Sequence, residues 1–195
     1  SLITVSLATA MLPNASRLAA SGDSAGVAQE FTKTIRLSLI AIVPATVAFM
    51  SLPGPMAMLL FGHGTGSDDA SWIAWTLMGF AIGLIPYTVQ FVCLRTFYAL
   101  EDTRTPFMLQ IIIAGTNMLG AWLLVWVVTD PGWVAAALAT AFSLAYLIGV
   151  FFSWQALKKR IPDLDGGQLV LHIVRLLLGS SIGGVAAYFL TDPII

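Results

Sequence analysis

The sequence predicts an all-α membrane protein, a bundle of about six transmembrane helices. Of its 195 residues, 58% are hydrophobic and only 10% are charged, with a mean hydropathy of +0.89. A soluble domain is about 45–50% apolar and about 25% charged. The apolar residues form long blocks, and all nine Lys and Arg residues lie at alternate ends of these blocks. By the positive-inside rule, the basic ends are expected on the cytoplasmic side.

The expected crossings follow from the block lengths, because a helix needs about 20 apolar residues to span the hydrocarbon. The first block is too short, but the alternation of charge counts it as a crossing, so its start is expected upstream in a longer protein. Both ends of the chain then lie outside. The predicted crossings are about 1–16, 34–53, 71–97, 107–128, 133–157 and 169–190 in one bundle.

The short links between these blocks have distinct sequences. Gly22 and Asp23 break the first link, and Val27, Phe31 and Ile35 then predict an amphipathic lead into the second crossing. Pro53–Gly54–Pro55 is expected to end that crossing, leaving residues 56–61 too short to span and placed at the outer interface. The outer links hold acids or no charge, and these acids are Asp68, Asp69, Asp130 and Asp192.

Prolines and glycines lie within several crossings. Pro44 and Pro86 each remove a backbone hydrogen bond and predict kinks. One face of the third crossing carries Gly79, Gly83, Pro86 and Gln90. The last crossing carries a second pair of small residues, Gly179 and Gly183. Close helix packing is favoured over a ligand role for both glycine pairs.

The residues that catalysis needs are few and far apart. His63 and His172 lack metal-ligand spacing, Cys93 stands alone within an apolar block, and no acid lies near the centre of a crossing. The sequence therefore argues against an enzyme. A net charge of −1 also argues against a nucleic-acid partner, which requires a basic face.

Uncharged polar side chains remain as candidates within the membrane. Ser6 and Thr9 share a face of the first helix, and Gln90 and Asn117 carry amides that need partners in hydrocarbon. Two interpretations stay open for these candidate cavity residues. Hydrogen bonding across helices is favoured over the lining of a wet cavity.

The most distinctive polar segment is the cytoplasmic link from Arg95 to Pro106. A helix cap at Asp102 with Pro106 in the first turn explains its second half. Arg95, with Phe97 and Tyr98 after it, suggests instead a cation held against protein. Arg95, Asp102 and Arg104 are therefore candidates for a cytoplasmic gate or latch.

The pattern Arg-x-Phe-Tyr-Ala-x-x-Asp-x-Arg-Thr-Pro at 95–106, with the segments 6–13 and 21–23, resembles the MurJ/MviN family of lipid II flippases. This family belongs to the multidrug/oligosaccharidyl-lipid/polysaccharide exporter superfamily. The resemblance covers the whole chain, and the sequence looks actinobacterial. It implies one lobe of a two-lobed transporter, with helices eight to thirteen of at least fourteen. The implied activity is alternating-access translocation of the undecaprenyl-linked peptidoglycan precursor across the bacterial cytoplasmic membrane.

The resemblance also implies partners and sites. The partners are membrane lipid, lipid II, the N-terminal lobe of the same chain and cell-wall synthesis proteins. The groove for the lipid tail would be lined by Leu176, Gly179, Gly183 and Ala187. No organic cofactor is implied. A sodium site would use Asn117 and Thr140, but Ala121 stands where the family places an acid, so sodium and the membrane potential both stay open as the driving force.

Two other functions stay open at this stage. One is export of another lipid-linked saccharide or of a drug within the same superfamily. The other is a non-transporting membrane scaffold for cell-wall synthesis.

Overall fold

The computed structural model describes residues 2–61 and 70–191, and within them the chain forms helices and no strand. The all-α prediction is therefore confirmed. The helices are α1 (Leu2–Ala20), α2 (Ser24–Ser51), α3 (Pro53–Phe61), α4 (Ala70–Ala99), α5 (Arg104–Val127), α6 (Pro131–Arg160) and α7 (Gly166–Thr191). His63 and the outer-link acids Asp68, Asp69 and Asp192 fall outside the described residues.

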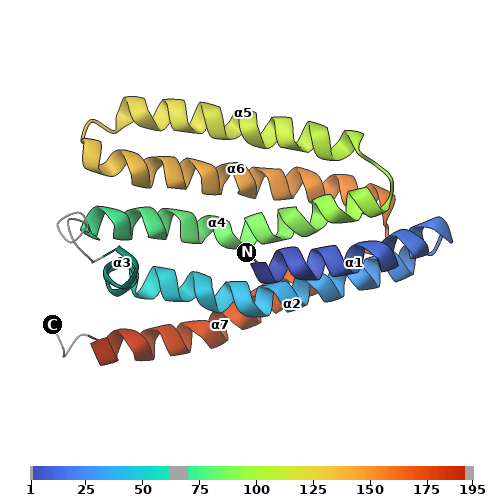
Figure 1. Ribbon diagram of the computed structural model, residues 1–195, viewed down its shortest axis with the longest axis horizontal. Helices are drawn as coiled ribbons and strands as arrows, with labels where there is room; N and C mark the ends of the chain where they lie inside the picture. Colours follow the sequence, from blue (N-terminus) through green and yellow to red (C-terminus); the bar gives the residue numbers. More distant parts are fainter. Residues whose placement is uncertain (1, 62–69, 192–195) are drawn as a thin grey trace.

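The long helices lie side by side along one axis (Figure 1). Helix α4 occupies the middle, packing on α6 on one side and on α1 and α2 on the other. Helix α5 packs mainly on α6, and α7 packs mainly on α2, so these two helices form the edges of the bundle. The links α1–α2, α4–α5 and α6–α7 all lie at one end, which gathers the basic residues there. We call this the basic end (Figure 1).

Five of the described helices are long and apolar enough to cross a membrane: α2, α4, α5, α6 and α7. The chain is therefore a multi-pass membrane protein. Helix α1 does not meet the same criterion, so the predicted crossing at its position stays a prediction. Short α3 lies across the opposite end from the basic links, between α2 and α4 (Figure 1).

Three helix boundaries differ from those expected. Helix α1 continues through Pro13 to Ala20, although the first crossing was expected to end near residue 16. The predicted amphipathic lead and the second crossing form one helix, α2, with Val27, Phe31 and Ile35 buried. Helix α3 begins at Pro53 rather than after Pro55, because the first turn of a helix tolerates proline.

The tightest packing lies toward the basic end. Phe31, Ile35, Phe97, Leu157 and Ile161 are at most 1% exposed and form one cluster with α1 and the start of α7. By contrast, one side of α5 is exposed along its length, as are the outward residues of α7. The ends of five helices are therefore joined at the basic end, while the edge helices offer apolar surface to lipid or to further protein.

The α1–α2 link turns on a glycine. Gly22 has a φ of +76°, in the left-handed region that favours glycine. The Asp23 amide donates to the Leu18 carbonyl at 3.0 Å and the Gly22 amide to the Ala19 carbonyl at 3.0 Å, the pattern of a Schellman motif. Asp23 then caps α2 by accepting from the Gly26 amide at 2.8 Å. The predicted break at this position is confirmed.

Replacing Gly22 with alanine is expected to destabilise the protein by about 1 kcal/mol, because a Cβ disfavours the left-handed conformation by about 1–2 kcal/mol. The measurement is thermal unfolding of the full-length protein in detergent. Gly115→Ala is the matched control, because a Cβ at this position in α5 meets nothing within 4 Å. Alanine there should be neutral or slightly stabilising. Equal effects of the two changes would contradict the role of the turn.

Candidate functional site

The glycine face of α4 packs against α6. The Ser143 hydroxyl donates to the Gly79 carbonyl at 2.6 Å. A Cβ at Gly79 would lie 2.9 Å from the Ala139 Cβ, and one at Gly83 would lie 2.5 Å from the Ser143 Oγ. The packing interpretation of this pair is confirmed, since neither glycine leaves room for a side chain or a ligand.

Gln90 continues the same face but meets no partner. Its side chain is 1% exposed, and neither its Nε2 nor its Oε1 has a hydrogen-bond partner among the described residues. The hydrogen bond across helices that the sequence favoured is therefore absent there. The amide instead lines a groove of about 470 Å³ between α4, α5 and α6.

The α4–α5 link is organised around Asp102. Its carboxylate accepts from the Thr105 amide at 3.0 Å and from the Thr105 hydroxyl at 2.7 Å, which caps α5 as predicted. It also pairs with the Arg160 guanidinium at 3.1 Å. Glu101 enables this placement by adopting a left-handed φ of 59° at the end of α4. Asp102 thus ties the α4–α5 link to the last residue of α6.

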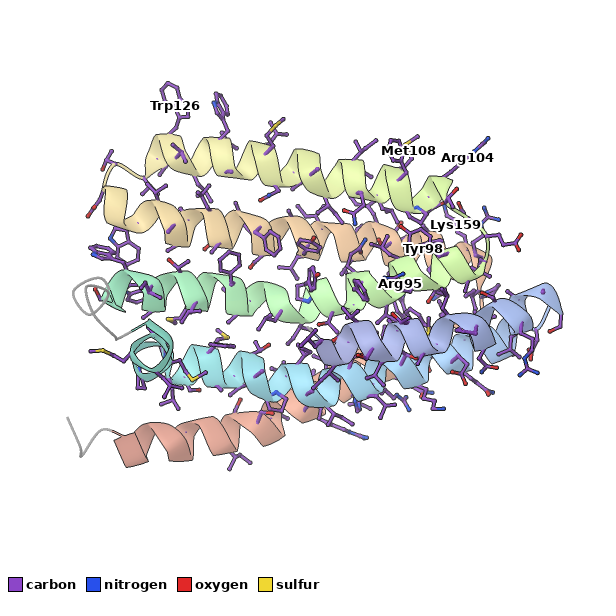
Figure 2. All side chains as sticks on the ribbon, viewed as in Figure 1. Arg95, Tyr98, Arg104, Met108, Trp126 and Lys159 are labelled. Carbon is purple, nitrogen blue, oxygen red and sulfur yellow. The ribbon has the colours of Figure 1, made fainter. Side chains whose placement is uncertain are left out.

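The side chains of the other two predicted gate residues do not join this contact. Arg104 is exposed and points away from the bundle, and Arg95 lies about one turn before the end of α4 (Figure 2). The Arg95 guanidinium lies over the Phe91 ring, 5.1 Å from its centroid, in the groove that Gln90 lines. The interpretation of Arg95 as a cation held against protein therefore agrees with its contact, but its aromatic partner is Phe91 rather than Phe97 or Tyr98.

The hydrogen bonds of Asp102 lower the pKa of its carboxyl. The two bonds from Thr105 are the largest cause, partial burial opposes them, and the charge of Arg160 adds to them. The carboxylate is consequently charged at neutral pH and available to both partners.

The polar residues of α1 lie on its exposed side. Ser6 and Thr9 are exposed, whereas Thr4 is 2% exposed and its hydroxyl has no partner in the described part of the chain. This placement leaves Ser6 and Thr9 free to face a cavity or another part of the protein.

The side chains predicted to hold sodium fall short of a cation site. Asn117 lies half-buried on α5, and the Thr140 hydroxyl on α6 donates to the Ala136 carbonyl at 2.8 Å. A Cβ at Gly79 would lie 3.3 Å from the Thr140 Oγ1, so this hydroxyl faces α4. Hard cations need several oxygen ligands, and Ala121 supplies none. These two residues by themselves therefore do not fit a sodium ion.

The predicted lipid-tail residues lie along α7. Gly183 lines a cleft of about 280 Å³ with Pro44 and Val47 of α2 and with Leu52, which directly follows α2. A Cβ at Gly179 or Gly183 meets nothing within 4 Å, so the packing interpretation of this pair is wrong. Leu176 instead packs on the core, and the side chain of Ala187 lies outside the described residues.

Two contacts at the basic end were missed from the sequence. The Arg36 guanidinium donates to the Gln168 amide oxygen at 2.8 Å, joining α2 to α7. The Ser24 hydroxyl donates to Asp163 at 3.0 Å, joining the start of α2 to the α6–α7 link. From the sequence, all four residues could be placed at the same membrane end. Their contact partners could not be predicted.

Comparison with known proteins identifies the family. A family model described as lipid II flippase MurJ matches residues 1–192, which include every described helix. The chain belongs to the MurJ family. The resemblance expected from the 95–106 pattern is therefore confirmed, while the actinobacterial source stays a prediction.

Several curated MurJ relatives are similar to the chain. A probable lipid II flippase MurJ of Rhizobium meliloti is 24% identical over 192 residues, covering 98% of this chain and 35% of that protein. The probable lipid II flippase MurJ of Haemophilus influenzae is 27% identical over 200 residues, covering 99% of this chain and 38% of that protein. The chain thus spans little more than a third of the length of these two relatives.

A solved structure shows the same fold. A lipid II flippase MurJ in an inward closed conformation superposes with a TM-score of 0.79 at 22% identity. The match covers 98% of this chain and 38% of that structure. The helix arrangement in Figure 1 is therefore that of part of a MurJ structure.

Proposed function

We propose that this chain forms part of one lobe of a transporter that moves lipid II across the bacterial cytoplasmic membrane by alternating access. The observation that carries the proposal is the family match over residues 1–192. The fold likeness supports the same conclusion, because it extends over 98% of the chain. Lipid II, bulk membrane lipid and the remaining lobe of the parent protein are the partners that this function requires. Cell-wall synthesis proteins are a further proposed class.

Transport rather than catalysis suits the described residues. No group of three or more His, Cys, Asp or Glu side chains that could hold a metal ion occurs among them. Polar side chains lie at the helix ends and also within the bundle, where Thr4, Gln90 and Ser143 are buried. The transport role that we propose rests on the family match rather than on this absence.

We propose that the basic end faces the cytoplasm. Arg17, Arg104 and Lys158–Arg160 all lie at this end, as the positive-inside rule requires. Cys93 is fully buried, so a cysteine introduced at exposed Ser21 would be the reactive thiol among the described residues. Labelling of Ser21→Cys by an impermeant reagent in intact cells should fail and should succeed after permeabilisation. Labelling of intact cells would contradict the orientation.

The cleft between α2 and α7 is proposed to take the lipid tail. The cleft is lined mainly by apolar residues, which include Gly183, Val47 and Leu52. A Cβ at Gly183 would meet nothing within 4 Å, so there is room beside this residue. Motion of the lobes would then use Pro44, at the wall of this cleft, and Pro86 as bend points, because proline weakens a helix locally.

Gly183→Leu is expected to reduce transport by at least about tenfold without lowering expression, because a Cβ at this position meets nothing within 4 Å and the longer side chain would occupy the cleft. The measurement is complementation of a flippase-depleted strain by the full-length protein, with membrane levels quantified. Gly115→Leu, which also enters open space but on α5, is the control and should complement normally. Normal growth with Gly183→Leu would remove the cleft from the transport path.

A further inference from the structure

A polar groove lies near the basic end, apart from the α2–α7 cleft. Its volume is about 470 Å³. Helix α4 supplies Tyr87, Gln90, Arg95 and Tyr98, whose spacing places them along one side of the helix, and α5 and α6 contribute Gln110 and Tyr146. Figure 2 shows Arg95 and Tyr98 on α4 at the end where the basic residues gather. The groove therefore combines hydroxyl, amide and guanidinium groups at the level of one membrane leaflet.

The charge of the groove is positive. Arg95 is half-buried, and within the described ranges no carboxylate lies within ion-pairing distance of it. None of the lining residues is acidic. The Phe91 ring under the guanidinium fixes its position without neutralising its charge. A partly desolvated cation of this kind favours an anionic ligand.

Gln90 points independently to a missing polar partner. It is 1% exposed, and both of its amide atoms are buried without a hydrogen bond in the described part of the chain. Leaving such a group unpaired costs more than a typical hydrogen bond contributes. A ligand in the groove that accepts a hydrogen bond from Nε2 would remove this cost.

The order of the two groups along α4 matches the order of groups in a membrane lipid. Arg95 lies four residues before the end of α4 and Gln90 lies nine residues before it. At a rise of 1.5 Å per residue, Gln90 is about 7.5 Å deeper in the membrane than Arg95. In a glycerophospholipid the phosphate likewise lies toward the water, with the ester carbonyls below it.

We propose that this groove binds a glycerophospholipid of the leaflet at the basic end. The phosphate pairs with Arg95, an ester carbonyl accepts a hydrogen bond from Gln90, and the acyl chains follow the exposed apolar sides of α5 and α6. This lipid is a bound component rather than cargo, so the inference does not depend on the proposed flippase function.

The test is titration of the purified full-length protein with dioleoyl phosphatidylglycerol, followed by native mass spectrometry. The wild-type protein should bind the lipid, and Arg95→Gln should weaken binding about tenfold, the loss expected for one charge-assisted hydrogen bond. Gln90→Leu should weaken binding severalfold while keeping the fold, since it replaces an unpaired amide with a side chain of similar size. Lys159→Gln is the matched control, because Lys159 is exposed at the same end but does not line the groove.

Two results would overturn the proposal. Equal weakening by Lys159→Gln and Arg95→Gln would mean attraction by the whole basic end rather than a site. Competition by lipid II, or by inorganic phosphate, for the bound phosphatidylglycerol would reassign the groove to cargo or to a free anion.

A second measurement covers the case in which the Arg95 variant does not fold. A photoactivatable phosphatidylglycerol added to the wild-type protein should cross-link within residues 87–98, and cross-links confined to other segments would contradict the site. Lipid II flipping is measured separately on the same samples. Loss of flipping with phospholipid binding retained would count against the proposed function alone, and the reverse against the groove alone.

Discussion

Gly83→Leu should prevent the full-length protein from accumulating in a folded form. A Cβ at this position would lie 2.5 Å from the Ser143 Oγ and 3.1 Å from its Cα, so α6 itself would have to move away from α4. Overpacking typically costs about 1–3 kcal/mol of folding free energy. Because the added side chain would meet the backbone of α6, we expect a cost at or above the upper end of this range. The measurement is the monodisperse yield on size-exclusion chromatography, followed by the thermal midpoint of what is recovered.

Gly115→Leu is again the control, because both changes add the same side chain to a transmembrane helix. Its Cβ meets nothing within 4 Å, so its yield should equal that of the wild type. Gly83→Ala should fall between the two. A normal yield for Gly83→Leu would mean that α4 and α6 do not approach each other this closely.

Asp102→Ala should destabilise the basic end by about 1–2 kcal/mol. The larger part is the lost cap to the Thr105 amide and hydroxyl, since removing an N-cap side chain costs about 0.5–2 kcal/mol. The pair with Arg160 adds little, because the Arg160 side chain is 62% exposed and solvent screens it. Thermal unfolding in detergent measures the sum.

Two partner variants separate the cap from the ion pair. Asp102→Asn keeps an oxygen that can cap α5 and should cost less than Asp102→Ala, while Arg160→Gln should cost only a few tenths of a kcal/mol. If Arg160→Gln were as damaging as Asp102→Ala, the ion pair rather than the cap would organise the link. Complementation by these variants tests whether the link also acts as a latch during transport.

We expect the stability of the protein to depend on pH through the Asp102 carboxyl. Its pKa in the folded protein is lowered, mainly by Thr105, below an unfolded value near 3.9. Its contribution to stability is therefore fully present above about pH 4 and is lost as the pH falls through the lowered pKa. Unfolding followed from pH 7 to pH 3 should show this loss in the wild type, with a smaller loss in Asp102→Asn.

The helices could be predicted because hydropathy is a local property. Blocks of about 20 apolar residues placed the five candidate spans within a few residues, apart from the early start of α2. One error came from proline, because Pro53–Gly54–Pro55 was expected to end a crossing without starting a new helix. A helix tolerates proline in its first turn, so α3 begins at Pro53.

The site was only partly predictable, because it depends on partners distant in sequence. Gly79 and Gly83 share a face with Gly-xxx-Gly spacing and do pack, but Gly179 and Gly183 have the same spacing and face open space. The partner of Asp102 is 58 residues away, and charge alternation reveals only that Arg160 lies at the same membrane end. The spacing of residues shows which of them share one helix face. Whether that face packs depends on the residues of the neighbouring helix.

Gln90 shows the same limit for buried polar groups. An amide in an apolar helix was expected to bond across to a neighbouring helix, yet it lies unpaired in a groove beside Arg95. The spacing of residues placed Gln90 on the same face of α4 as Gly79 and Gly83, which pack against α6. Only the structure reveals that a groove lies beside Gln90 on this face.

We propose that the chain is part of a lipid II flippase. The direct measurement is the leaflet accessibility of lipid II in cells that are depleted of their own flippase and supplied with the full-length parent of this chain. We expect lipid II to become accessible at the outer leaflet, and we expect Gly183→Leu at equal membrane level to prevent this. Continued accumulation in the inner leaflet, with the unaltered protein present in the membrane, would contradict it and favour another exported lipid or a scaffold role.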